Sequence, residues 1–162
     1  DTPGGAGAAT VVVVPYSPDG RRPVPSAGFL AAVEAHCCRH SLLTETVSVV
    51  GPTFVPVDLS VSVDPEPSAD PARVRHDVRE SMAAFLDPLD GFEGDGWPFG
   101  RPVYASELYE RLEELDAVVD AVDVGVSTAG RVAIGDRADT LPSLEQVAVD
   151  LTTGDDGCGG WS

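Results

Sequence analysis

The sequence predicts an α+β fold in which helices pack on a mainly antiparallel sheet, with elements in the order β-α-β-β-α-α-β. Two patterns support this prediction. Residues 57–64 alternate valine or leucine with aspartate or serine, which is typical of a strand with one buried and one solvated face. In segments 29–37 and 74–85, apolar residues recur every three or four positions, as they do along amphipathic helices.

The first part of the chain is expected to contain a linker, a strand and a helix. The opening stretch, DTPGGAGAAT, indicates a flexible linker over residues 1–9, before an α+β domain over residues 10–128. The run ATVVVVP is rich in β-branched residues and predicts a buried central strand that ends at Pro15. Ser26 is a suitable N-cap for the first helix, whose apolar face is expected to comprise Phe29, Leu30, Val33 and Cys37.

The middle of the domain is predicted to contain two strands and two helices. The stretch TETVSVVGPTFVPVDLSVSVD indicates the two strands. Asp70 and Pro71 predict the start of the second helix, and Pro88 marks its end because proline cannot continue the hydrogen-bond ladder. Ser106 is expected to cap a third, short helix, whose apolar stripe is Leu108, Leu112 and Leu115.

The C-terminal part is predicted to be rich in strands. The stretch VVDAVDVGVS indicates a strand with one apolar face, formed by Val118, Val122, Val124 and Val126. Residues 129–153 are expected to form a short β-rich extension, with two strands around the Leu141–Pro142 turn. Residues 154–162 are expected to be a flexible tail.

Acidic residues dominate the charge of the chain. There are 27 Asp and Glu against 10 basic residues, all of them Arg, and the net charge is −17 at pH 7. This charge argues against nucleic acid as a partner, because binding requires cations that neutralise phosphates. It is typical of a halophilic host, where salt screens the repulsion between carboxylates, and the alternative is an acidic surface for a cationic partner. No run of about 18 apolar residues occurs, so we expect no membrane insertion by this chain.

A cluster of metal-ligand types occurs in HCCRH, residues 36–40. His36 and His40 lie four positions apart on one helical face, with Cys37 beside them. A small metal- or ligand-binding ferredoxin-like domain that uses His36, Cys37 and His40 is therefore an alternative function. Against it, neighbouring side chains on a helix point about 100° apart, so Cys37 and Cys38 could not easily share an ion. We expect no metal site and no cofactor.

Nucleophilic catalysis is a second alternative, as a hydrolase that uses Cys37 or Cys158 with His40 or His76 as its base. The flanking residues contain no nucleophile elbow and no glycine run that would form an oxyanion hole. We therefore expect no catalytic residues, and the chain is not expected to be an enzyme.

The stretch GDGWPFGRPVYASELYERL, residues 94–112, has the composition of a protein interface. Trp, Tyr and Arg are the residue types that most often anchor interfaces. For Trp97 and Phe99, packing into the chain's own core and insertion into a neighbour's pocket both remain open. In the second case Arg101 is expected to pair with a carboxylate. The expected interface residues are Trp97, Phe99, Arg101, Tyr104, Glu107, Tyr109 and Arg111.

The chain resembles the C-terminal part of baseplate J-like proteins, the baseplate wedge components of contractile phage tails and contractile injection systems. The stretch FLAAVEAHCCRHSLLTETVSVVGPTFVPVDLSVSV carries the first part of this resemblance, and LDPLDGFEGDGWPFGRPVYASELYERLEELDAVVDAVDVGV carries the second. It covers roughly residues 28–127, and its most specific element is Gly96–Arg101 followed by Ser106–Leu108.

The resemblance implies a structural protein that forms the ring around the hub of a tail and rearranges on contraction. It implies as partners other baseplate wedge subunits, either copies or paralogues, together with sheath-initiator and hub proteins. It also implies a place in a phage tail-like particle that is assembled in the cytoplasm and becomes a virion or an extracellular injection particle. Family members are usually longer, so the chain is expected to be part of a longer protein.

Overall fold

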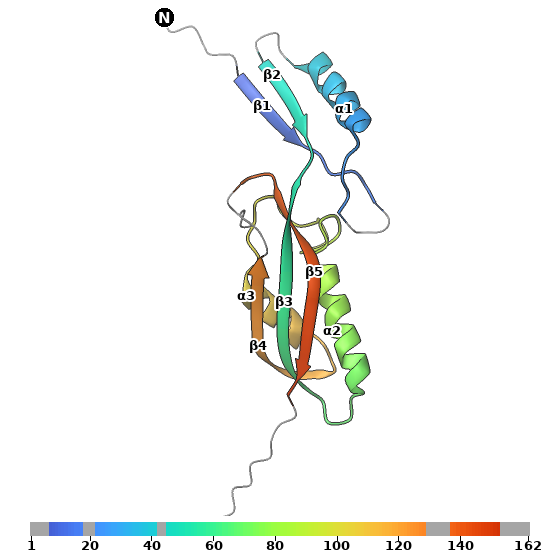
Figure 1. Cartoon of the computed structure of the whole chain (residues 1–162), viewed down its shortest axis with the longest axis vertical. Coiled ribbons are helices and arrows are strands. Elements are labelled where there is room, and N and C mark those ends of the chain that lie inside the picture. Colours follow the sequence, from blue (N-terminus) through green and yellow to red (C-terminus); the bar gives the residue numbers. More distant parts are fainter. Residues whose placement is uncertain (1–6, 18–21, 42–44, 129–136, 153–162) are drawn as a thin grey trace, which may run out of the picture.

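The computed structural model describes residues 7–17, 22–41, 45–128 and 137–152. Within these ranges the predicted α+β class is confirmed. The elements, labelled in Figure 1, are β1 (Gly7–Val12), α1 (Ala27–His40), β2 (Glu45–Val50), β3 (Thr53–Pro65), α2 (Pro71–Phe85), α3 (Ala105–Glu113), β4 (Val118–Thr128) and β5 (Thr140–Leu151).

The described strands form two sheets, which corrects the prediction of a single, mainly antiparallel one. β1 pairs with β2 in parallel. The other sheet has the order β4-β3-β5, with β4 antiparallel and β5 parallel to β3. The ladder breaks between β2 and β3 at Gly51–Pro52, where the proline has no N–H to donate. Figure 1 shows β1, β2 and α1 set apart from the larger sheet along the long axis of the chain.

The main core lies on one face of the β4-β3-β5 sheet, against α2 and α3. Alternate residues of β3 are buried there, which confirms the predicted alternation: Val55, Val57, Leu59, Val61 and Val63. α2 lies against β5 and α3 against β4, and the two helices contribute Val74, Val78, Met82, Phe85, Leu108 and Leu112. This apolar layer fixes both helices and therefore both ends of the loop that joins them.

Two of the three predicted helix caps are confirmed. The side-chain oxygen of Ser26 accepts a hydrogen bond from the backbone N–H of Phe29, and Asp70 accepts one from Ala72, both at 3.2 Å. The predicted Ser106 cap is wrong, because α3 already begins at Ala105 and its N-cap, Tyr104, makes no side-chain bond. No described helix is long and apolar enough to cross a membrane.

β1 and α1 are more exposed than the sequence predicts. The expected buried central strand is wrong, because no residue of β1 from Ala8 onward is buried and β1 pairs only with β2 in the described sheet. No residue of α1 is buried either; Leu30, Val33 and Cys37 are half-buried, and Phe29 is exposed. One helix on a two-stranded sheet has too little apolar surface to enclose a core.

β4 buries every third residue instead of every second one. Val118, Ala121 and Val124 are buried, whereas Val119 and Val122 are 56% and 52% exposed. The predicted burial of Val122 is therefore wrong. Two register shifts against β3 explain this, since each leaves an extra residue in β4, at Val119 and at Val122. Such β-bulges turn side chains away from the face that strict alternation predicts.

β5 runs through Leu141 and Pro142 as one strand, so the predicted turn at these residues is wrong, whereas the part of the first predicted strand before residue 137 lies outside the described residues. Pro142 lies within β5 opposite Val55. Proline is tolerated there because β5 is an edge strand, so the missing N–H interrupts no second ladder. Leu141 and Val149 of β5 join the core beside β3.

The connecting loop, residues 86–104 between α2 and α3, sends Trp97 into this same core. The indole is 3% exposed and packs edge-on against Phe85 and Phe92, with ring centroids 5.6 and 5.7 Å away. Its Nε1–H donates to the backbone oxygen of Arg101 at 2.9 Å, so the one polar atom of the ring is satisfied. The question that the sequence leaves open for Trp97 is thereby answered, because the residue lies in the chain's own core.

We predict that Trp97→Ala lowers the free energy of unfolding of the purified chain by about 3–5 kcal/mol, because it removes a large buried side chain and leaves a cavity. The matched control is Phe99→Ala in the same loop, since Phe99 is 43% exposed and its loss should cost less than about 1 kcal/mol. Urea unfolding followed by circular dichroism measures both. Equal, small effects would contradict the core position of Trp97.

Candidate functional site

The connecting loop has a backbone that only certain residues permit. Phe92 and Gly96 have left-handed φ values of 57° and 81°. A Cβ at Gly91 would lie 2.4 Å from the backbone oxygen of Asp87, so no larger residue fits there. The N–H of Phe92 donates to the backbone oxygen of Phe85 at 2.8 Å, which ties the loop to the end of α2. The loop is therefore a fixed structure, positioned by the core beneath it.

Arg101 finds its carboxylate within the same chain. Its Nη1 donates to Oε2 of Glu107 at 2.8 Å, and its Nη2 donates to Oε1 of the same residue. The guanidinium also stacks 4.3 Å from the ring centroid of Phe92 and 5.7 Å from that of Tyr104. The side chains of Arg101 and Glu107 are 27% and 25% exposed. Arg101 thus closes the loop onto the first turn of α3.

The electrostatics of this pair favour both charges. The hydrogen bond to Glu107 raises the pKa of Arg101, and the same bond lowers the pKa of Glu107. Partial burial acts against both shifts without overcoming them. The pair is therefore ionised at neutral pH and stabilises the loop, with no need for a carboxylate from a neighbour.

The other predicted interface residues fall into two groups. Tyr109 and Arg111 are partly committed within the chain: the Tyr109 hydroxyl accepts a hydrogen bond from the N–H of Val124 at 2.9 Å, and Arg111 pairs with Glu114 at 2.6 Å. Phe99 and Tyr104 are large and 43% and 51% exposed. That this region contacts another protein stays a prediction, and Phe99 and Tyr104 offer it the most aromatic surface.

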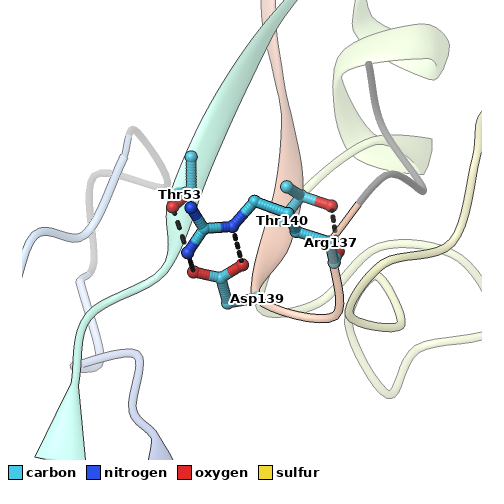
Figure 2. A network of polar contacts seen from close by, with 4 residues as sticks. All are labelled: Thr53, Arg137, Asp139 and Thr140. Atoms are coloured by element: carbon cyan, nitrogen blue, oxygen red, sulfur yellow. Dashed lines mark hydrogen bonds and ion pairs between the residues drawn. The ribbon is translucent and has the colours of Figure 1, made fainter. Parts of the chain in front are cut away.

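A polar network that the sequence does not predict lies at the start of β3 and β5 (Figure 2). Asp139 accepts two hydrogen bonds from Arg137 at 2.8 Å and one from the Thr53 hydroxyl at 3.2 Å. The backbone oxygen of Thr140, a residue with no exposed surface, accepts from the N–H of Gly100 at 2.8 Å. Arg137, Asp139 and Thr140 are neighbours in the sequence, but no local pattern signals Thr53 or Gly100, which meet them only in the folded chain.

The residues considered for metal binding do not gather. His36 and His40 have ring centroids 4.8 Å apart on α1. Cys37 does not form a cluster of three close ligand atoms with them, as expected for neighbouring residues that lie about 100° apart around a helix. The described residues contain one such cluster, His76, Asp77 and Glu80 on α2, which is solvated. Cys158, considered for catalysis, lies outside the described residues.

We predict that Glu107→Gln lowers the free energy of unfolding by about 1–2 kcal/mol at neutral pH, because it removes one charge from a hydrogen-bonded pair. The pKa of Glu107 is lowered in the folded chain, so the contribution is present above its ordinary value of 4.5 and is lost as the pH falls through the lower folded pKa. The difference between wild type and variant should therefore shrink as the pH falls well below 4.5.

Urea unfolding of both proteins at neutral and at acidic pH measures this difference in the free energy of unfolding. The other carboxylates are present in both proteins, so their contributions cancel in the difference. Glu114→Gln is the control, because its pair with Arg111 is more exposed and should contribute less than about 0.5 kcal/mol. A difference that stays undiminished at low pH would contradict a role for the Glu107 charge.

Comparison with known proteins identifies a similar fold but no family. No family model and no curated protein matches the chain. The structure is similar to a chain in the cryo-EM structure of the anti-feeding prophage (AFP) baseplate, 6-fold symmetrised, with a TM-score of 0.59 and 16% identity. The match covers 90% of this chain and 31% of that chain, so this chain spans about a third of the length of the protein it matches. At this identity the likeness shows the fold alone.

Proposed function

We propose that the chain is a structural component of the baseplate wedge of a contractile injection system or phage-like tail, without a catalytic role. The observation that carries the proposal is the similarity in fold to a chain of the AFP baseplate over 90% of this chain. The sequence resemblance over roughly residues 28–127 supports the same function. A common fold can host unrelated functions, so the agreement of these two observations matters more than either one alone.

In this role the chain would act mechanically, in the ring around the tail hub. The β4-β3-β5 sheet with α2 and α3 has its own core and would move as a rigid part. The smaller sheet with α1 is joined to it through Gly51–Pro52 and through side-chain contacts of Arg22 with Ser143 and Glu145. A part with its own core and a smaller, more exposed part joined to it by few connections suit a component that rearranges when the tail contracts.

The proposed partners are other wedge subunits, either copies or paralogues, and sheath-initiator and hub proteins. Phe99 and Tyr104 would contact one of them, since they are exposed aromatic side chains on a loop that the core holds in place. The particle would be assembled in the cytoplasm and would act as a virion or an extracellular injection particle when mature.

We predict that deletion of the gene for this chain prevents assembly of complete tail-like particles in its host, because the wedge ring would lack a component. Mass spectrometry should find the wild-type chain in purified particles at a constant ratio to the sheath protein. Phe99→Ala combined with Tyr104→Ala should reduce the amount of the chain in particles while lowering the melting temperature of the purified chain much less than Trp97→Ala does. Val119→Ala, at an equally exposed valine on β4, is the control. Complete particles without the chain would contradict the proposal.

We also propose a halophilic host, on the basis of a net charge of −17 and the absence of lysine. Transfer from about 1 M to about 0.1 M KCl lengthens the screening distance from about 3 to about 10 Å, so carboxylates repel one another more strongly. We predict that the melting temperature of the purified chain falls on this transfer. The drop should shrink in the variant Glu110→Gln with Glu113→Gln, which removes two exposed charges on α3. A melting temperature independent of salt would contradict a halophilic origin.

A further inference from the structure

A groove of about 450 Å³ lies along the connecting loop and reaches the segment between β1 and α1. Its apolar lining includes Leu89, Phe92 and Phe99 of the loop, and Val14 from the other segment. Both Phe99 and Trp97 line this groove. The Phe99 side chain is half-exposed there, whereas Trp97 is buried and lies on the side of the groove that faces the core. The groove is thus an apolar surface that the chain itself leaves partly uncovered.

The loop side of this groove is held in place before any partner arrives. Phe92 has a left-handed backbone and is fixed by its hydrogen bond to Phe85 and by the Arg101 guanidinium stacked on its ring. Asp87 accepts hydrogen bonds from the N–H groups of Leu89 and Asp90 at 2.8 and 2.9 Å. A preformed site loses little conformational entropy on binding, which favours recognition of a partner segment.

The described charged residues at the groove have one sign. Glu93 and Asp95 line it and are exposed, and no cationic side chain of the described residues lines it. Neither carboxylate forms an ion pair with a described residue. Arg101 is attracted by Glu93, but its hydrogen bonds go to Glu107. A second copy of this chain would bring a further net charge of −17. Even at high salt, where only charges in contact interact strongly, the two carboxylates favour an occupant that places an Arg or Lys against them.

We propose that this groove binds an extended segment of a different, positively charged protein. An apolar side chain of that segment would lie against Leu89 and Phe99, and an Arg or Lys beside it would pair with Glu93 and Asp95. The proposal rests on the proposed function, because the occupant would be another protein of the same tail-like particle. It goes further in assigning the groove, the chemistry of the occupant and the exclusion of a second copy.

Photo-crosslinking in assembled particles tests this proposal directly. The photoreactive residue p-benzoylphenylalanine replaces Phe99, particles are purified and illuminated, and mass spectrometry identifies the linked peptide. The expected product is a link to a segment of another particle protein that is rich in Arg or Lys. A link to a second copy of this chain, a link to an acidic segment, or incorporation without any link would overturn the proposal. Each of these three results would leave the proposed baseplate function intact. Absence of the wild-type chain from particles would overturn both the groove proposal and the proposed baseplate function.

A charge-reversal variant keeps the test decisive if the photoreactive residue blocks assembly. Glu93→Arg with Asp95→Arg should reduce the amount of the chain in particles by about tenfold or more, because attraction at the rim becomes repulsion. Asp120→Arg with Asp123→Arg is the matched control, since it makes the same charge change on exposed residues of β4. The melting temperatures of the purified variants verify that both fold. Equal incorporation of the two variants would overturn the proposal.

Discussion

The position of strand β3 determines the rest of the structure. It is hydrogen-bonded to β4 on one side and to β5 on the other, and its alternate residues from Val55 to Val63 are buried under α2 and α3. Burial of a valine or leucine side chain stabilises a fold by about 1.5–3 kcal/mol, so this row is a large source of stability. Because the row fixes α2 and α3, it also fixes where the connecting loop begins and ends. The loop then adds Trp97 to the same core.

Within the connecting loop, some residues stabilise the fold and others lie on the surface. Trp97 and the Arg101–Glu107 pair hold the loop down, since their interactions are satisfied inside the chain. Phe99 and Tyr104 stay on the surface, and Phe99 lines the groove together with Glu93 and Asp95. This division suits a scaffold protein, in which a rigid unit must present the same surface to its neighbours before and after movement. The baseplate function that we propose for the chain is compatible with this arrangement, and the similarity to a baseplate chain shows the common fold.

Local patterns in the sequence predict the elements whose causes are local. The alternation in β3 and the Asp70–Pro71 start of α2 are visible in the sequence and present in the structure. Val122 is predicted on the wrong face because its bulge depends on pairing with β3. β1 is predicted to be buried because its sequence is apolar. The sequence of a strand does not show whether other elements cover it in the folded chain. The aromatic residues of the loop are recognisable as important, but only three-dimensional packing distinguishes the buried Trp97 from the exposed Phe99.

A cryo-EM reconstruction of the baseplate, from particles of an organism that encodes this chain, would decide whether the chain is part of the wedge ring. We expect density in the ring around the hub that fits the β4-β3-β5 sheet with α2 and α3. We also expect Trp97 to lie inside this unit and Phe99 to contact another protein. A complete baseplate whose density is fully explained by other proteins, with no place for this fold, would show that the chain has no place in the wedge.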